Sequence, residues 1–158
     1  MMRPLLTVLL LAAAPVWAQN VTFGGMKADT SLPVEVAADN LAVNQSNGSA
    51  TFTGNVVIGQ GEMRLAADTV TVDYAKGGQN RIKSLHATGN VTLVSGEDAA
   101  EAAEATYNVE SGNVVLTGDV VLTQGPNVLT GNNMTVNLET GTAQVEGRVR
   151  SVLQSGAN

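Results

Sequence analysis

One short phrase recurs four times along this chain at a nearly constant step. Its first copy reads Thr53-Gly54-Asn55-Val56, and its glycine recurs at Gly89, Gly118 and, in a degraded copy, Gly147, at steps of 35, 29 and 29 residues. A second column of glycines steps by 29, 35 and 29 residues, which agrees with the first if six extra residues lie between Gly77 and Gly89. The chain is therefore four copies of one unit, and it has to be interpreted as a repeat protein.

Apolar residues alternate with polar ones inside each unit. Phe52, Val56 and Ile58 share one face across the first copy of the phrase, with Gly54 between them. Alternation of this kind over five to eight residues, bounded by Gly, Asn and Asp, is typical of half-buried strands. The repeat glycine occupies the apolar face, where a strand interior normally carries a side chain, so it marks a bend, a bulge or a close backbone approach. The second column of glycines fits hairpin turns that need a positive φ, at Gly48, Gly77, Gly112 and Gly141.

The predicted fold is all-β. Each unit reads as a strand, a tight turn, a strand through the repeated phrase, a second turn and a return strand. Four such units make an elongated β jelly roll of about 14–16 antiparallel strands, with two facing sheets that bury the apolar set between them. Residues 98–105 are rich in Ala and Glu and look helical, but the repeat columns place them in a strand.

The first eighteen residues are typical of a Sec-type signal peptide. Arg3 precedes an apolar run, and small residues precede a cleavage site after Ala18. A retained membrane anchor is the alternative, but a span needs about 20 apolar residues, and Pro15 interrupts this run. The chain has no cysteine, which excludes a disulfide framework and a lipid-modified amino-terminal cysteine.

The charge balance excludes one class of partner. Without Arg3 the chain carries seven basic residues against fourteen acidic ones, for a net charge of −7. Nucleic acid is not an expected partner, because phosphate binding depends on clustered Lys and Arg, and the basic residues here are scattered.

Residue types that carry catalysis are sparse. His86 is the single histidine, and we expect it to be a solvent-facing strand residue. Asp39 and Asp68 occupy equivalent repeat positions, but Ala103 and Asn132 fill the same column, so we interpret it as a strand-end polar position and not a catalytic one. The acidic run from Glu97 to Glu104 lacks calcium-loop spacing. We therefore expect no enzyme, no metal site and no cofactor.

Four segments together carry a family resemblance. They are residues 32–39 (LPVEVAAD), 50–58 (ATFTGNVVI), 66–72 (AADTVTV) and 115–120 (VLTGDV). These segments resemble the OstA-like domain of the LptA family, the periplasmic bridge of the lipopolysaccharide transport machinery. The resemblance extends from about Leu32 to Leu153. One copy of the phrase is a weak signal, but four in register after a signal peptide are specific.

The resemblance implies a twisted β jelly roll that is open along one side and located in the periplasm. It implies head-to-tail homo-oligomers, which join an inner-membrane-anchored OstA-like component to the N-terminal domain of an outer-membrane translocon. Lipopolysaccharide is the implied cargo, with its lipid A acyl chains shielded in an apolar groove. A long polar C-terminal tail and an N-terminal basic cluster, which some members carry, are not found here. A grip on lipid phosphates is therefore in doubt, and acyl chains should dominate recognition.

The resemblance and the alternation together give two sets of candidate residues. For each groove candidate, a place in an ordinary core is the equally weighted alternative. The candidate groove lining comprises Val34, Val36, Val43, Phe52, Val56, Leu65, Val72, Tyr74, Tyr107, Leu116 and Val136. The candidate docking strands carry Val34, Glu35 and Val36 at one end of the chain, and Val145, Arg148, Val149 and Arg150 at the other.

The expected organisation is a signal peptide over 1–18, a flexible segment over 19–31, the jelly roll over 32–153 and a tail over 154–158. Three other functions stay open. The chain could be the membrane-anchored partner of the bridge, which would keep its first eighteen residues. It could be a structural β-solenoid or adhesin module without lipid cargo, or a β-helical polysaccharide lyase or hydrolase, which would need clustered carboxylates.

Overall fold

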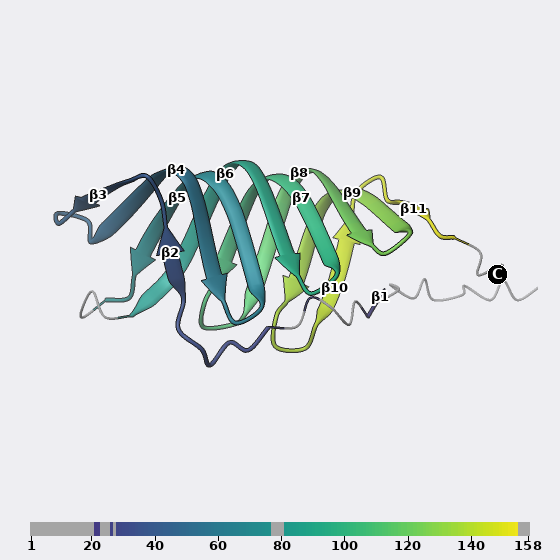
Figure 1. Cartoon of the computed structure of the whole chain (residues 1–158), viewed down its shortest axis with the longest axis horizontal. Coiled ribbons are helices and arrows are strands. Elements are labelled where there is room, and N and C mark those ends of the chain that lie inside the picture. The colour runs from purple at the N-terminus through teal and green to yellow at the C-terminus, as the bar shows by residue number, and fades with distance from the viewer. Residues whose placement is uncertain (1–20, 23–25, 27, 77–80, 155–158) are drawn as a thin grey trace, which may run out of the picture.

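The protein is a single antiparallel sheet that is bent along its length (Figure 1). The computed structural model describes residues 21–22, 26, 28–76 and 81–154. The sheet order is β1-β10-β9-β8-β7-β6-β5-β4-β2, with β3 also on β4 and β11 also on β9. The described residues form eleven strands: β1 (Val21–Thr22), β2 (Glu35–Ala37), β3 (Asn40–Asn44), β4 (Ser49–Gln60), β5 (Met63–Tyr74), β6 (Ile82–Ser95), β7 (Asp98–Asn108), β8 (Asn113–Gln124), β9 (Asn127–Asn137), β10 (Thr142–Glu146) and β11 (Arg150–Val152).

Each pairing of two long strands shifts its register near the middle, and the left-handed bulge residues lie in β4, β6 and β8. Between β4 and β5 the register jumps from Thr53↔Thr69 to Val56↔Ala67, so that Gly54 and Asn55 oppose one residue of the partner. The same shift recurs in every pairing from β5 to β9. Because a bulge bends its strand, the repeated shifts bend the whole sheet along one line.

The bend divides the sheet into two walls that face each other. Wall A contains β2 and β11 and the halves of the long strands next to the β4–β5, β6–β7 and β8–β9 turns. Wall B contains β1, β3 and β10 and the remaining halves. By residue number, wall A is 35–37, 56–60, 63–67, 91–95, 98–102, 120–124, 127–131 and 150–152, and wall B is 21–22, 40–44, 49–53, 69–74, 82–88, 104–108, 113–117, 133–137 and 142–146.

The repeated glycine makes the bend possible. Gly54 has a φ of 83° and the following Asn55 a φ of 48°, a conformation that Gly adopts freely and Asn tolerates. A Cβ on Gly54 would lie 2.7 Å from Asp39 Oδ2, so only glycine fits. Asn55 Nδ2 donates to the same Asp39 Oδ2 at 3.0 Å, which fixes the neighbouring strands at the bend.

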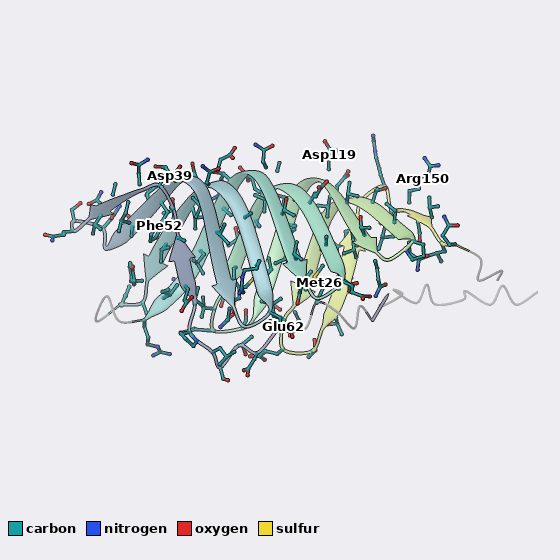
Figure 2. The ribbon with its side chains drawn as sticks, in the orientation of Figure 1. Met26, Asp39, Phe52, Glu62, Asp119 and Arg150 are labelled. Carbon is teal, nitrogen blue, oxygen red and sulfur yellow. The ribbon has the colours of Figure 1, made fainter. Side chains whose placement is uncertain are left out.

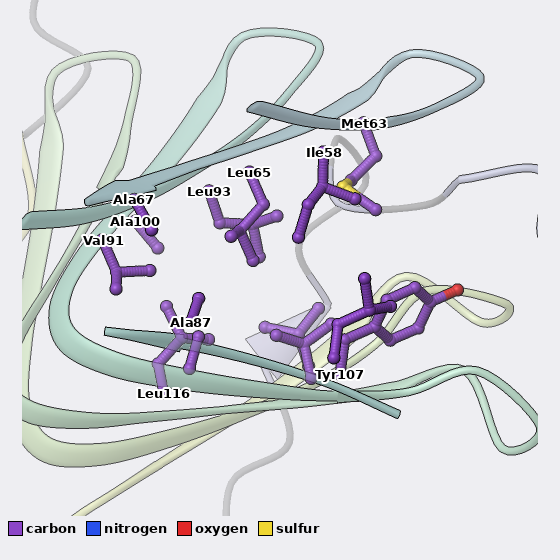
Figure 3. Packing of buried hydrophobic residues seen from close by; sticks show 14 of the residues in the cluster. Ile58, Met63, Leu65, Ala67, Ala87, Val91, Leu93, Ala100, Tyr107 and Leu116 are labelled. Carbon is purple, nitrogen blue, oxygen red and sulfur yellow. The ribbon is translucent and has the colours of Figure 1, made fainter. Parts of the chain in front are cut away.

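The core lies between the walls. Figure 3 shows Ile58, Leu65 and Leu93 of wall A pointing toward Leu116 and Tyr107 of wall B. All five side chains are buried, within one cluster of Val, Leu, Ile, Met and Ala. The alternating apolar and polar residues of the sequence therefore face this interior and the solvent in turn.

The predicted all-β jelly roll is confirmed, and β7 confirms the strand over 98–105. The predicted 14–16 strands in two sheets are wrong in detail: the described residues form eleven strands in one sheet, because each strand continues through its bulge instead of ending there. The positive φ at Gly48, Gly112 and Gly141 confirms three hairpin turns, and Gly77 lies outside the described residues. The signal peptide over 1–18 also lies outside them.

The column of Asp39 and Asp68 was predicted to lie at strand ends, which holds for Asp39, directly before β3, and is wrong for Asp68. Asp68 lies in the middle of β5, and Asp39 lies between β2 and β3, both at the bend. Asn90 Nδ2 donates to Asp68 Oδ2 at 2.9 Å, as Asn55 does to Asp39. This column therefore serves the bend, and His86 is exposed on β6 as expected.

Candidate functional site

The candidate site is the apolar space between the two walls. Six of the predicted lining residues are buried there with at most 1% of their surface exposed: Val56, Leu65, Val72, Tyr107, Leu116 and Val136. Four more are half-buried and pack against this cluster: Val34, Val36, Phe52 and Tyr74. The interior is thus filled by its own side chains, and a groove-lining role for these residues stays a prediction.

One end of the space is open at β3. Leu41 is 57% and Val43 56% exposed, although both face inward, since they pair with Phe52 and the buried Ala50. All residues of β3 are exposed, and among the described residues it pairs with β4 alone. Val43 therefore belongs to an exposed apolar end of the inner face, and its groove-lining role stays a prediction. Leu41 shares that position and was not among the predicted site residues.

The opposite end opens into a pocket of about 540 Å³. It lies among β8, β9, β10 and the chain around β11, where Val149 and Leu153 are exposed. The predicted docking residues Val145 and Val149 line it, whereas Arg148 and Arg150 are exposed beside it. Its apolar lining is Leu122, Val128, Leu129, Ala143, Val145, Val149 and Leu153.

The two sets of predicted docking residues lie at opposite ends of the sheet (Figure 1). Glu35 and Val36 belong to β2, which ends the sheet order next to β4, and Arg150 begins β11 beyond β9. Within the part of the chain that the structure describes, strands β2, β3 and β11 each pair on one side only. Their free sides present backbone groups that can pair with another chain.

A buried hydrogen bond joins the walls at the edge opposite the bend. Tyr107 Oη, on wall B, donates to Gln60 Oε1 of wall A at 2.6 Å. Gln60 Nε2 in turn donates to the main-chain oxygens of Thr30 and Leu32, at 3.1 and 2.9 Å. Gln60 was not predicted as a site residue, because a glutamine at a strand end gives no sequence signal that separates it from a solvated one.

Burial raises the pKa of the Tyr107 phenol, and the negative charge of Glu139 raises it further. The phenol therefore stays protonated at neutral pH and can act as the donor to Gln60. Its orientation is fixed by a partner that has its own hydrogen bonds.

The described part of the chain offers little for chemistry. Over 21–22, 26, 28–76 and 81–154 there is no group of three or more His, Asp or Glu placed to hold a metal ion. Within the same residues, no helix has the length and apolar character required to cross a membrane. His86 Nδ1 forms a hydrogen bond with Thr106 Oγ1 at 2.9 Å on the outer surface.

Comparison with known protein families identifies what this bent sheet is. Residues 35–142 match the family described as LptA/(LptD N-terminal domain) LPS transport protein. The chain belongs to this family. The matched range extends from the edge strand β2 to the start of β10, so it includes most of both walls.

Several individual proteins are similar. An uncharacterized protein of Rhizobium meliloti is 32% identical over 114 residues, which cover 68% of this chain and 61% of that protein. LPS-assembly protein LptD of Vibrio cholerae is 35% identical over 53% of this chain and 10% of its own length. Lipopolysaccharide export system protein LptA of Escherichia coli K12 is 29% identical over 48% of this chain and 41% of its own length.

The chain therefore spans about three fifths of the Rhizobium protein and smaller shares of LptA and LptD. A solved structure has the same fold. The crystal structure of LptH from Pseudomonas aeruginosa, named as an LptA-homologous periplasmic component, superposes with a TM-score of 0.71 over 81% of this chain and 99% of that one. At 21% identity this similarity shows the LptA-like fold alone.

Proposed function

We propose that this protein is a periplasmic bridge that carries lipopolysaccharide from the inner to the outer membrane. It is a carrier and not an enzyme. In this proposal the space between the walls shields the lipid A acyl chains, and protomers stack end to end. The signal peptide is removed after Ala18, and the partners at the two ends are a membrane-anchored OstA-like component and the N-terminal domain of the translocon.

One observation carries the proposal: the apolar inner face is continuous from one open end to the other. It begins at the exposed Leu41 and Val43, passes through the buried cluster that contains Leu93 and Leu116, and reaches the pocket near Leu153. An ordinary β core is closed by polar residues at its ends. An apolar face left open at both ends suits a long apolar ligand that passes through.

The composition of the inner face suits acyl chains. It is built almost entirely of Val, Leu, Ile, Met and Ala, so it has few polar groups that a lipid would leave unsatisfied. Burying one methylene is worth about 0.8 kcal/mol, so several chains buried along their whole length would exceed the limit of about 18–21 kcal/mol for non-covalent complexes. The protein must therefore hold its cargo partially, which allows onward transfer.

Stacking is supported by the edge strands. β3 and β2 end the sheet on one side, and β11 ends wall A on the other. Backbone pairing between such edges would join the inner faces of two protomers, because residues directly opposite each other in paired strands point to the same face. The exposed Leu41 and Val43 would then be covered by the neighbouring protomer or by its cargo.

Photo-cross-linking with purified lipopolysaccharide, labelled in its acyl chains, tests this proposal. A benzophenone side chain replaces Val36, which faces inward opposite the buried Ile58, or Thr71, which faces outward on β5. The proposal predicts a labelled adduct at Val36 and none at Thr71. Adducts of equal yield at both positions, or none at Val36, would contradict it.

A further inference from the structure

A segment outside the sheet closes the edge opposite the bend. This strap, residues 28–34, contains no strand and runs between the two walls. The amide of Ala28 donates to the carbonyl oxygen of Leu138, next to wall B, at 2.9 Å. Gln60 of wall A holds the main-chain oxygens of Thr30 and Leu32. In Figure 2 Met26 and Glu62 lie on the side of the ribbon opposite Asp39 and Asp119, which mark the bend.

The side-chain hydrogen bonds between wall A and the strap come from one buried residue, Gln60. Gln60 is 2% exposed and uses both ends of its carboxamide, accepting from Tyr107 and donating to the strap. Thr30 Oγ1 adds a longer contact with Glu139 Oε1 at 3.4 Å. Strap, wall A and wall B are thus linked through a single hydrogen-bonded unit.

Met26, just before the strap, is completely buried and belongs to the core cluster. Its side chain is unbranched and flexible, and it fills irregular apolar space as a short acyl chain would. Since Ile58, Met63 and Leu93 around the core are also at most 1% exposed, an added acyl chain needs some element to move.

The strap is the element that moves most easily. Removing a strand from the body of the sheet breaks an extended pairing: β4 and β5 alone pair over ten residue positions. The strap is held by the hydrogen bonds of Gln60 and Ala28, by the contact of Thr30, and by the packing of Ala28 and Val34 on the core. It also has its own local turn, in which the Ser31 amide donates to Asp29 Oδ1 at 3.0 Å.

We infer that the strap covers a lateral acyl-chain site, in which Met26 occupies the place of one saturated chain of the cargo, and that cargo binding displaces the strap from Gln60. This inference rests on the proposed function. It assigns to the edge opposite the bend a lateral entry route in addition to the two open ends. Gln60 and Tyr107 are positioning residues in it, because they act by holding the strap.

A disulfide can pin the strap without altering the sheet. A Cβ built on Gly61 lies 3.9 Å from the Asp29 Cβ, close to the separation found in disulfides. The double variant Asp29→Cys/Gly61→Cys is unambiguous, because the chain has no other cysteine. Gly61 has a φ of 58°, so the substitution strains the turn. The oxidised and reduced forms of the same variant both carry that strain, so the difference between them reports the disulfide alone.

The test adds the Val36 cross-linker to this double variant and uses the same labelled lipopolysaccharide. If the strap must open, the oxidised form loses at least about tenfold in adduct yield at subsaturating lipid, because its binding-competent fraction falls, and reduction restores the yield. Equal yields in the oxidised and reduced forms would overturn the strap inference and leave the proposed function standing. No adduct in the Val36 cross-linker variant without the two cysteines would overturn both the strap inference and the proposed function.

Hydrogen exchange provides a second readout. The Ala28 amide is protected through Leu138, and the Asn132 amide is protected through the carbonyl of Gly147, at 2.8 Å, in the bend. Lipopolysaccharide should speed exchange at Ala28 and leave Asn132 unchanged. Slower exchange at Ala28 would mean that the strap tightens on cargo, contrary to the inference.

Discussion

Gly89 packs directly against the Asp68 carboxylate. A Cβ on Gly89 would lie 2.5 Å from Asp68 Oδ2, closer than any side chain can accept without movement. The same relationship joins Gly54 to Asp39, Gly118 to Ala103 and Gly147 to Asn132. The repeat that dominates the sequence is therefore the line along which the sheet bends, and the bend makes one sheet into two walls.

Replacing Gly89 by alanine should destabilise the protein more than replacing a glycine in an open turn. Gly48 is the matched control, because it also has a positive φ, 68° against 81°, but has nothing within 4 Å of its missing Cβ. Both variants place a side chain at a left-handed φ, which lowers the free energy of unfolding by about 1–2 kcal/mol. Gly89→Ala should lower it by about 1–3 kcal/mol more, because the added methyl group is overpacked. Urea unfolding measures the difference, and equal losses would show that contact with Asp68 is not the constraint.

The third bend offers a test by rescue. A Cβ on Gly118 would lie 2.7 Å from the Ala103 Cβ. Gly118→Ala should therefore cost less free energy of unfolding in an Ala103→Gly background than alone, by about 0.5–3 kcal/mol, as expected for residues in contact. Additive losses in the double-mutant cycle would mean that the neighbouring strand does not crowd this position.

The Tyr107 hydroxyl should stabilise the fold through Gln60. Tyr107→Phe leaves the buried Gln60 Oε1 without its donor, which should cost about 1–3 kcal/mol in free energy of unfolding. Tyr74→Phe, a half-buried tyrosine on the same wall, is the control and should cost less. Losses of the same size in the two variants would argue against the cross-wall hydrogen bond.

Tyr107 should also give the protein an alkaline limit. Because burial raises its pKa in the folded state, the folded protein retains a proton that the unfolded chain loses above the ordinary pKa of 10.0. The free energy of unfolding should therefore be unaffected by this group below pH 10.0 and fall as the pH rises above it. Unfolding titrations should show this decline weakened in Tyr107→Phe; an identical slope would assign it to other groups.

The open end at β3 should govern self-association. Val43→Glu places a charge on the inward-facing, exposed end, whereas Val57→Glu places one on an exposed outer position of β4. Both sites are solvent-exposed, so stability should change little. Sedimentation at increasing concentration should show end-to-end oligomers weakened by Val43→Glu and retained by Val57→Glu. Equal effects of the two substitutions would exclude β3 as the docking edge.

Much of the fold could be predicted from the sequence. The repeat columns predicted which residues of each strand face the interior. They also predicted a strand at β7 in spite of its helix-favouring composition, and the strand forms because pairing with β6 and β8 overrides weak local preference. Strand number was not predictable in this way. A glycine followed by Asn or Asp ordinarily indicates the end of a strand, and whether pairing continues beyond it depends on the neighbouring strands.

The site was predictable in part, for a physical reason. Alternation identifies which face of a strand is apolar but not whether that face is packed or open. Leu116 and Val43 were therefore both predicted as groove-lining residues, although Leu116 is buried and Val43 is exposed. Gln60 and the strap were not predictable, because their contacts join residues 28 to 110 positions apart in the chain. Only the folded sheet brings these groups together.

Cross-linking in living cells tests the central claim, that cargo travels between the walls, most directly. Phe52 is the best position, because a benzophenone amino acid is itself a phenylalanine derivative and this side chain faces inward, half-buried against the core. Its neighbour Thr53 is exposed on the outer face and serves as the control. In cells making labelled lipopolysaccharide we predict an adduct at Phe52 and none at Thr53. Adducts at Thr53 alone, or at neither position, would contradict transport through the interior of this fold.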